Sequence, residues 1–135
     1  MKRLHLDANV VLRFLRDDDA KQSPAARRLI GEASKGAFGA ILSVVTVGEI
    51  FYALRASYQI PRPEAAALLD GLGRSGAFDV EREGRLLDAL ARVRAANVDF
   101  GEAWRAATAV EVGESVASFD EDFGKFADGD WVRPK

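Results

Sequence analysis

Short apolar runs alternate along the chain with longer stretches in which apolar residues recur at helical spacing. Five runs have the length and composition of β-strands: 4–6, 38–45, 77–80, 115–119 and 131–132. Helices are predicted between them at 8–15, 23–34, 46–54, 64–72, 83–96, 103–112 and 121–126. This alternation predicts an α/β fold, a three-layer α/β/α sandwich with helices on both faces of a parallel sheet.

Two of the predicted helices begin with recognisable capping signals. Ser23 before Pro24 has the residue types preferred at a helix N-cap and at the first helical position. Thr46, with Glu49 three residues later, fits a capping box. We therefore expect Thr46 to cap its helix and Glu49 to lie in the first turn.

Length and composition favour a single folded domain over residues 1–135. Apolar residues make up 48% of the 135 residues and charged residues 30%, as in ordinary globular proteins. No apolar run approaches the roughly 18 to 20 residues that cross a bilayer. The first seven residues lead into a strand rather than resembling a signal peptide, so we expect a cytoplasmic protein with no membrane partner.

The chain has few of the residues that most catalytic sites use. It lacks cysteine, which excludes a thiolate zinc site and a cysteine nucleophile, and its one histidine is His5. We interpret His5 as a strand residue beside the core, which leaves catalysis to Asp and Glu. The net charge of −2 lacks the basic excess typical of nucleic-acid binding, and the scattered arginines single out no RNA-binding residue.

Acidic residues occupy the positions where α/β proteins usually have their sites. Two predicted strands end at Asp7 and Asp120, and ligands bind beyond the carboxyl ends of parallel strands. Glu49 and Glu102 lie near helix starts, where a favourable interaction with the helix dipole is a sufficient structural explanation for each alone. Together, several converging carboxylates require a counter-charge, and Mg²⁺ or Mn²⁺ is the natural one. The chemistry this favours is phosphodiester hydrolysis.

Four segments, at 6–12, 43–49, 99–103 and 118–123, resemble the four motifs of PIN domains in order and with normal spacing. The closest likeness is to VapC-type toxins of toxin–antitoxin pairs. The resemblance implies a central parallel sheet of about five strands in the order 3-2-1-4-5. The first and fourth strands would then be neighbours, and Asp7 and Asp120 would flank one crevice.

The resemblance also implies roles for individual residues. The catalytic and metal-binding carboxylates would be Asp7, Glu49, Glu102 and Asp120. The supporting residues would be Asn9, Thr46, Asp99 and Asp122, with Ser43 a weaker candidate. Glu102 stands where the family usually has Asp, so its carboxylate lies one methylene farther from the backbone. Either Glu102 still reaches the ion, or Asp99 takes part of the role.

The function implied is that of a Mg²⁺- or Mn²⁺-dependent endoribonuclease, the toxin of a toxin–antitoxin module. Its partners would be an RNA substrate and a cognate protein antitoxin, within a homodimer and a toxin–antitoxin hetero-oligomer. Apolar residues such as Phe51, Tyr52 and Tyr58 belong either to the core or to a groove or dimer surface. Two alternatives remain open: a catalytically silent PIN-like interaction module, and a metal-dependent phosphatase acting on small phosphate esters.

Overall fold

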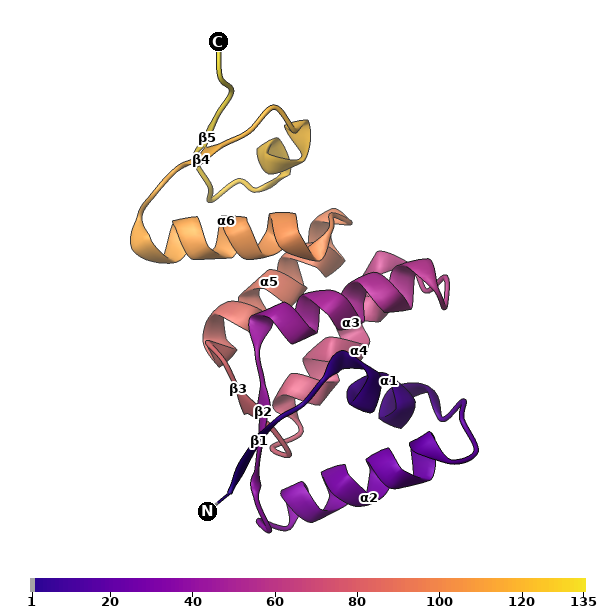
Figure 1. Ribbon diagram of the computed structural model, residues 1–135. Coiled ribbons are helices and arrows are strands. Elements are labelled where there is room, and N and C mark those ends of the chain that lie inside the picture. The colour runs from indigo at the N-terminus through magenta and orange to yellow at the C-terminus, as the bar shows by residue number, and fades with distance from the viewer. Residues whose placement is uncertain (1) are drawn as a thin grey trace.

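The computed structural model describes residues 2–135, and every predicted helix and strand is present in it (Figure 1). The elements, in chain order, are β1 (Arg3–His5), α1 (Ala8–Arg16), α2 (Gln22–Ser34), β2 (Gly39–Leu42), α3 (Val44–Ala56), α4 (Arg62–Arg74), β3 (Asp79–Val80), α5 (Glu83–Ala96), α6 (Phe100–Val112), β4 (Val116–Ala117), the 3₁₀ helix η1 (Glu121–Lys125) and β5 (Trp131–Val132). The predicted α/β class with a parallel sheet is confirmed. Most strands are shorter than expected.

Three strands form the larger sheet, with β2 in the middle and all strands parallel. Leu4 pairs with Ala40 across β1 and β2, and Ile41 pairs with Asp79 across β2 and β3. Ala40 and Leu42 are buried, which agrees with a strand covered by helices.

Helix packing supplies most of the core. α1 packs against α2 and α3, α4 lies between α3 and α5, and α6 packs against α5. Leu54, Leu69 and Leu90, one each on α3, α4 and α5, are at most 2% exposed. Burying such a side chain contributes roughly 1.5–3 kcal/mol, so these helix contacts stabilise the fold more than its short strands do. None of the helices within residues 2–135 is long and apolar enough to cross a membrane.

The sheet differs from the expected order at one place. β4 pairs only with β5, in a separate two-stranded parallel sheet, and not with β1. Figure 1 shows β4 and β5 on the opposite side of α6 from β1, β2 and β3. The order 3-2-1 holds within the larger sheet, but the expected single five-stranded sheet is not what the structure shows. A two-residue strand forms few hydrogen bonds, so the packing of α6 on α5 decides where β4 lies.

The two N-caps predicted from the sequence are both wrong. α3 starts at Val44, and its N-cap is Ser43, whose Oγ accepts from the Thr46 amide at 3.3 Å. Thr46 as the cap is therefore wrong, and Glu49 lies in the second turn of α3 rather than the first. Ser23 is likewise inside α2 rather than its cap, and the Asp19 carboxylate accepts from the Gln22 amide at 2.7 Å. In both cases a polar side chain earlier in the sequence accepts a hydrogen bond from an amide of the first helical turn.

We expect Ser43→Ala to lower the free energy of unfolding by about 1 kcal/mol, the usual effect of removing a helix cap. Ser57→Ala is the matched control, because Ser57 is exposed at the other end of α3 and its side chain donates no hydrogen bond within residues 2–135. Urea denaturation followed by circular dichroism measures both variants. Equal destabilisation by the two substitutions would show that Ser43 does not stabilise α3 as a cap.

Candidate metal centre

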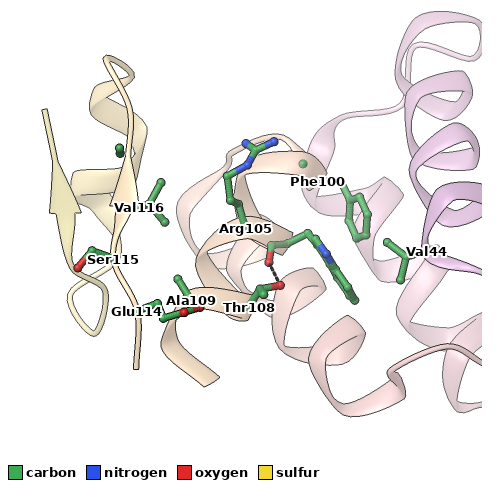
Figure 2. A pocket seen from close by; sticks show the side chains of 11 residues that line it. Val44, Phe100, Arg105, Thr108, Ala109, Glu114, Ser115 and Val116 are labelled. Carbon is green, nitrogen blue, oxygen red and sulfur yellow. Dashed lines mark hydrogen bonds between the residues drawn. The ribbon is translucent and has the colours of Figure 1, made fainter. Parts of the chain in front are cut away.

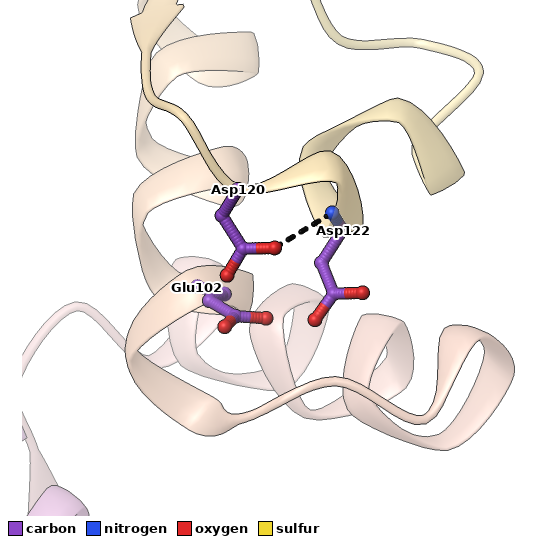
Figure 3. Close-up of side chains that lie close together, drawn as sticks. All are labelled: Glu102, Asp120 and Asp122. Carbon is purple, nitrogen blue, oxygen red and sulfur yellow. Dashed lines mark hydrogen bonds between the residues drawn. The ribbon is translucent and has the colours of Figure 1, made fainter.

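Three carboxylates from the C-terminal third of the chain lie together. Glu102, Asp120 and Asp122 each offer an oxygen within 4.8 Å of the other two (Figure 3). Figure 3 shows Glu102 on α6 and the two aspartates at the start of η1, with all three side chains directed toward a common point. These three residues are called the acidic cluster below.

Local backbone structure fixes the two aspartates. Asp120 is the N-cap of η1, and its Oδ1 accepts from the Asp122 amide at 2.9 Å. The Asp120 amide in turn donates to Ser118 Oγ at 2.9 Å. Phe123 of η1 is buried, which anchors this turn on the core. The positions of the carboxylates therefore follow from the capping of a short helix whose one apolar residue points inward.

The surroundings of Glu102 raise the pKa of its carboxyl group strongly. Burial, followed by the nearby carboxylates of Asp120 and Asp122, raises the pKa of Glu102 to about 7. Its Oε2 atom is buried without a hydrogen-bond partner among residues 2–135. A buried acceptor that lacks a donor is costly, so this oxygen requires a proton or a cation.

Two cations flank the acidic cluster. Lys125 Nζ lies 3.0 Å from Asp122 Oδ1, and this contact, the largest cause, lowers the pKa of Asp122. Arg62 Nε donates to Asp99 Oδ1 at 2.9 Å, and this hydrogen bond, the largest cause, raises the pKa of Arg62, with smaller contributions from the charges of Glu102 and Asp122. Neither cation contacts Glu102 or Asp120 within residues 2–135, so much of the negative charge stays uncompensated.

The acidic cluster fits a hard divalent cation. Its ligand atoms are all carboxylate oxygens, which suit Mg²⁺ and Mn²⁺ rather than soft metals. The unpartnered Oε2 of Glu102 is an additional acceptor at the same place. A cation there would replace the proton that Glu102 retains up to about pH 7.

Asp7 lies outside the acidic cluster. It is the exposed N-cap of α1, and its Oδ1 accepts from the Ala8 amide at 2.9 Å. The preceding residue is held by α3, since Thr46 Oγ1 donates to the Leu6 carbonyl at 3.4 Å and accepts from Ser43 Oγ at 3.1 Å. Ser43 and Thr46 therefore fix the end of β1 immediately before Asp7.

The remaining predicted residues also lie apart from the acidic cluster. Glu49 is exposed on α3, with no hydrogen bond or ion pair among residues 2–135. Asn9 is exposed and lines a hollow between α1 and α2. Asp99 pairs with Arg62, so the structure brings Glu102 and not Asp99 to the two C-terminal aspartates.

A hollow of about 520 Å³ runs along β4 and the outer side of α6 (Figure 2). Figure 2 shows Phe100 and Val44 at one end of it, Val116 at the other, and Arg105 between them. The beginning of α3 thus lies across this hollow from β4.

Some residues around the acidic cluster were not singled out by the sequence. Lys125 follows Asp122 at a spacing of three residues, which is a readable signal for a contact within one helical turn. Arg62 and Asp99 are 37 positions apart in the sequence, so no local sequence pattern predicts their contact. Asp122, expected only to support the site, is a full member of the acidic cluster.

The chain was compared with protein families and with curated proteins. A family model described as PIN domain matches residues 4–129. The matched region extends from β1 to the loop before β5 and includes all three residues of the acidic cluster. The comparison with curated proteins finds no match.

The raised pKa of Glu102 predicts a specific pH dependence of stability. An acid whose folded pKa is about 7, above the unfolded value near 4.5, stabilises the fold fully below pH 4.5 and loses this contribution as pH rises through 7. In EDTA, the Tm of the wild type should therefore fall between pH 5.5 and 8 more than that of Glu102→Gln. Differential scanning fluorimetry of both proteins measures the difference.

The same titration should govern metal binding. Since one proton leaves as the cation enters, the apparent Kd for Mn²⁺ should rise about tenfold for each pH unit below 7. Identical pH profiles of Tm and of Mn²⁺ affinity in the wild type and in Glu102→Gln would contradict this account of Glu102.

Proposed function

Because the chain belongs to the PIN domain family, whose members are generally metal-dependent nucleases, we propose that it is an endoribonuclease that hydrolyses RNA phosphodiester bonds with Mg²⁺ or Mn²⁺. The observation that carries the proposal is the acidic cluster with the buried, unpartnered oxygen of Glu102. A single PIN domain over residues 1–135 would hold the complete site.

The residues proposed to hold the cation are Asp7, Glu49, Glu102 and Asp120, with Asn9, Thr46, Asp99 and Asp122 in support. When bound, the ion supplies a positive charge against the phosphoryl oxygens and acidifies a water molecule. Asp120 supplies the N-cap carboxylate of η1, and Glu102 has to release its proton before it binds the ion. Lys125 limits the negative charge by holding Asp122.

The proposal requires Asp7 to lie beside the acidic cluster. The backbone groups of β1 and β4 would allow this, because each strand has one unpaired edge. At β1, the Leu6 amide donates to a carbonyl of β2 and the Lys2 carbonyl accepts from an amide of β2. The amide and carbonyl of His5 therefore point to the opposite edge of β1, which is unpaired. β4 directs the Val116 and Ser118 amides to the β5 side, so the groups of Ala117 face its unpaired edge. Each edge thus presents both a donor and an acceptor to a parallel neighbour.

We propose that the active form has β4 paired with β1 through these two edges. The pairing would satisfy backbone groups that otherwise depend on water. Asp7 lies two residues beyond β1 and Asp120 three residues beyond β4, so the pairing would bring them to the same end of one sheet.

The toxin role, the antitoxin partner, the dimer and the cytoplasmic location are part of the same proposal. They are supported by the motif resemblance to VapC-type toxins rather than by any contact within the chain. A small neighbouring gene that encodes a DNA-binding antitoxin would support the toxin role independently of the chemistry.

We expect the purified protein to cleave RNA in Mn²⁺ and to lose this activity in EDTA. Asp120→Asn should lower the cleavage rate roughly hundredfold or more, equivalent to about 2.7 kcal/mol at 1.36 kcal/mol per tenfold change. Glu121→Gln is the matched control, because Glu121 is the next residue but lies outside the acidic cluster and pairs with Arg133. Gel analysis of an end-labelled RNA measures the rates.

The outcomes separate the alternatives. Mn²⁺ binding without cleavage of any RNA would favour the silent interaction module. Turnover of simple phosphate esters with intact RNA would favour the phosphatase. Equal loss of activity in Asp120→Asn and Glu121→Gln, with both variants folded by circular dichroism, would show that the acidic cluster is not the site.

A further inference from the structure

A second pocket, of about 570 Å³, opens between α3, α4 and the beginning of α6. Its lining includes Phe51, Tyr52, Arg55, Arg62, Phe100 and Gly101. The volume lies in the range of sites that enclose one small organic group. Neither the acidic cluster nor the hollow along β4 includes its two arginines.

The side chains that line the pocket carry more positive than negative charge, with the carboxylates of Glu102 and Asp122 close enough to act on Arg62 from outside it. Arg55 has no carboxylate partner among residues 2–135, and its Nη1 donates to the Ile60 carbonyl at 3.2 Å. Arg62 donates through Nε to Asp99, which leaves both of its Nη groups without a partner in this part of the chain. Two arginines and one aspartate give a net charge of +1 in a chain whose total is −2. Such a pocket favours an anion, and guanidinium groups suit phosphate oxygens.

Aromatic side chains form the rest of the pocket. Phe51 and Phe100 are buried, and their rings pack at a tilt with centroids 6.0 Å apart, which makes one side of the pocket apolar. Tyr52 also lines the pocket but is 73% exposed, an unusual position for a large aromatic residue without a partner. Exposed aromatic rings beside positive charges are the features that bind unstacked nucleobases.

The pocket also adjoins the proposed catalytic residues. Gly48 and Gly101 line it, and each immediately precedes a proposed metal-binding glutamate, Glu49 on α3 and Glu102 on α6. A nucleotide held there would place its neighbouring phosphodiester toward those carboxylates. A base within a duplex is stacked on both faces and is not free to contact a ring, so the ligand has to be single-stranded.

We propose that this pocket binds one nucleotide of a single-stranded RNA next to the bond that is cleaved. Its phosphate contacts Arg55 and Arg62, and its base lies against Tyr52. The inference rests on the proposed nuclease function, because the nuclease supplies the reason for a nucleotide at this place. The charge of the two arginines favours RNA over an uncharged apolar peptide as the occupant.

The test measures binding without cleavage. A fluorescein-labelled single-stranded decaribonucleotide is titrated with the full chain in EDTA, and anisotropy is followed at several salt concentrations. Arg55→Gln should weaken binding about tenfold and reduce the slope of log K against log salt by about 0.7, the value for one phosphate contact on a single strand. Tyr52→Ala should weaken binding about tenfold with an unchanged slope, because stacking carries no charge.

Two further variants keep the result interpretable. Arg55→Lys retains the charge and should restore the salt slope. Arg94→Gln is the matched control, since Arg94 is an exposed arginine of α5 with no ion pair among residues 2–135, and it should bind like the wild type. Circular dichroism establishes that each variant is folded.

Wild-type affinity in both Arg55→Gln and Tyr52→Ala would overturn the inference, as would an equal loss in Arg94→Gln. Displacement of the RNA by polyglutamate at equal charge concentration would instead identify a site for acidic peptides. If RNA binds through this pocket but is never cleaved in Mn²⁺, the nuclease proposal fails while RNA binding by the pocket is established.

Discussion

The repulsion among three carboxylates within 4.8 Å of one another is the constraint on which this account depends. The fold imposes it, because the capping of η1 and the burial of Phe123 fix Asp120 and Asp122 beside the first turn of α6. Below about pH 7 a proton on Glu102 relieves the repulsion, and above that pH a cation has to. A site that destabilises the empty protein in this way is suited to binding a divalent ion.

The same fold leaves its two sheets incomplete. Helix packing, with almost completely buried leucines on α3, α4 and α5, contributes far more than strands of two to four residues. As a result α6 packs on α5, and β4 lies on the other side of α6 from β1 (Figure 1). The free edges of the two strands present matching backbone groups. A bound cation shared by Asp7 and Asp120 would favour the arrangement in which they pair.

The sequence predicted the class of the fold and the elements well, because apolar periodicity depends on burial, which governs most of this chain. It predicted α5 with its observed bounds, whereas the strand expected to end at Asp120 ends at Ala117, and Asp120 is the N-cap of η1. It misplaced the start of α3, where Ser43 and Thr46 both have capping hydroxyls and only the register of the turn decides between them. The family resemblance implied a β1–β4 pairing, which depends on the position of α6 and has no local signal in the sequence.

For the site as well, the sequence indicated residues within short motifs but not the contacts between distant helices. The motif resemblance named Glu102 and Asp120 as metal-binding residues and Asp122 as a supporting residue, and the structure brings these three carboxylates together. The pairing of Asp99 with Arg62 and the pocket around Arg55 and Tyr52 depend on how α3, α4 and α6 meet. Contacts between distant helices follow from packing, and a single sequence gives them no pattern.

The central claim is that Asp7 and the acidic cluster share one divalent ion. A crystal structure determined with Mn²⁺, with the ion located by its anomalous scattering, tests this most directly. The account predicts a strong anomalous peak coordinated by Glu102 and Asp120, with Asp7 at the same ion and β4 paired with β1. The absence of a peak at these carboxylates, or an ion bound there while β1 and β4 stay unpaired and Asp7 remains outside, would contradict it.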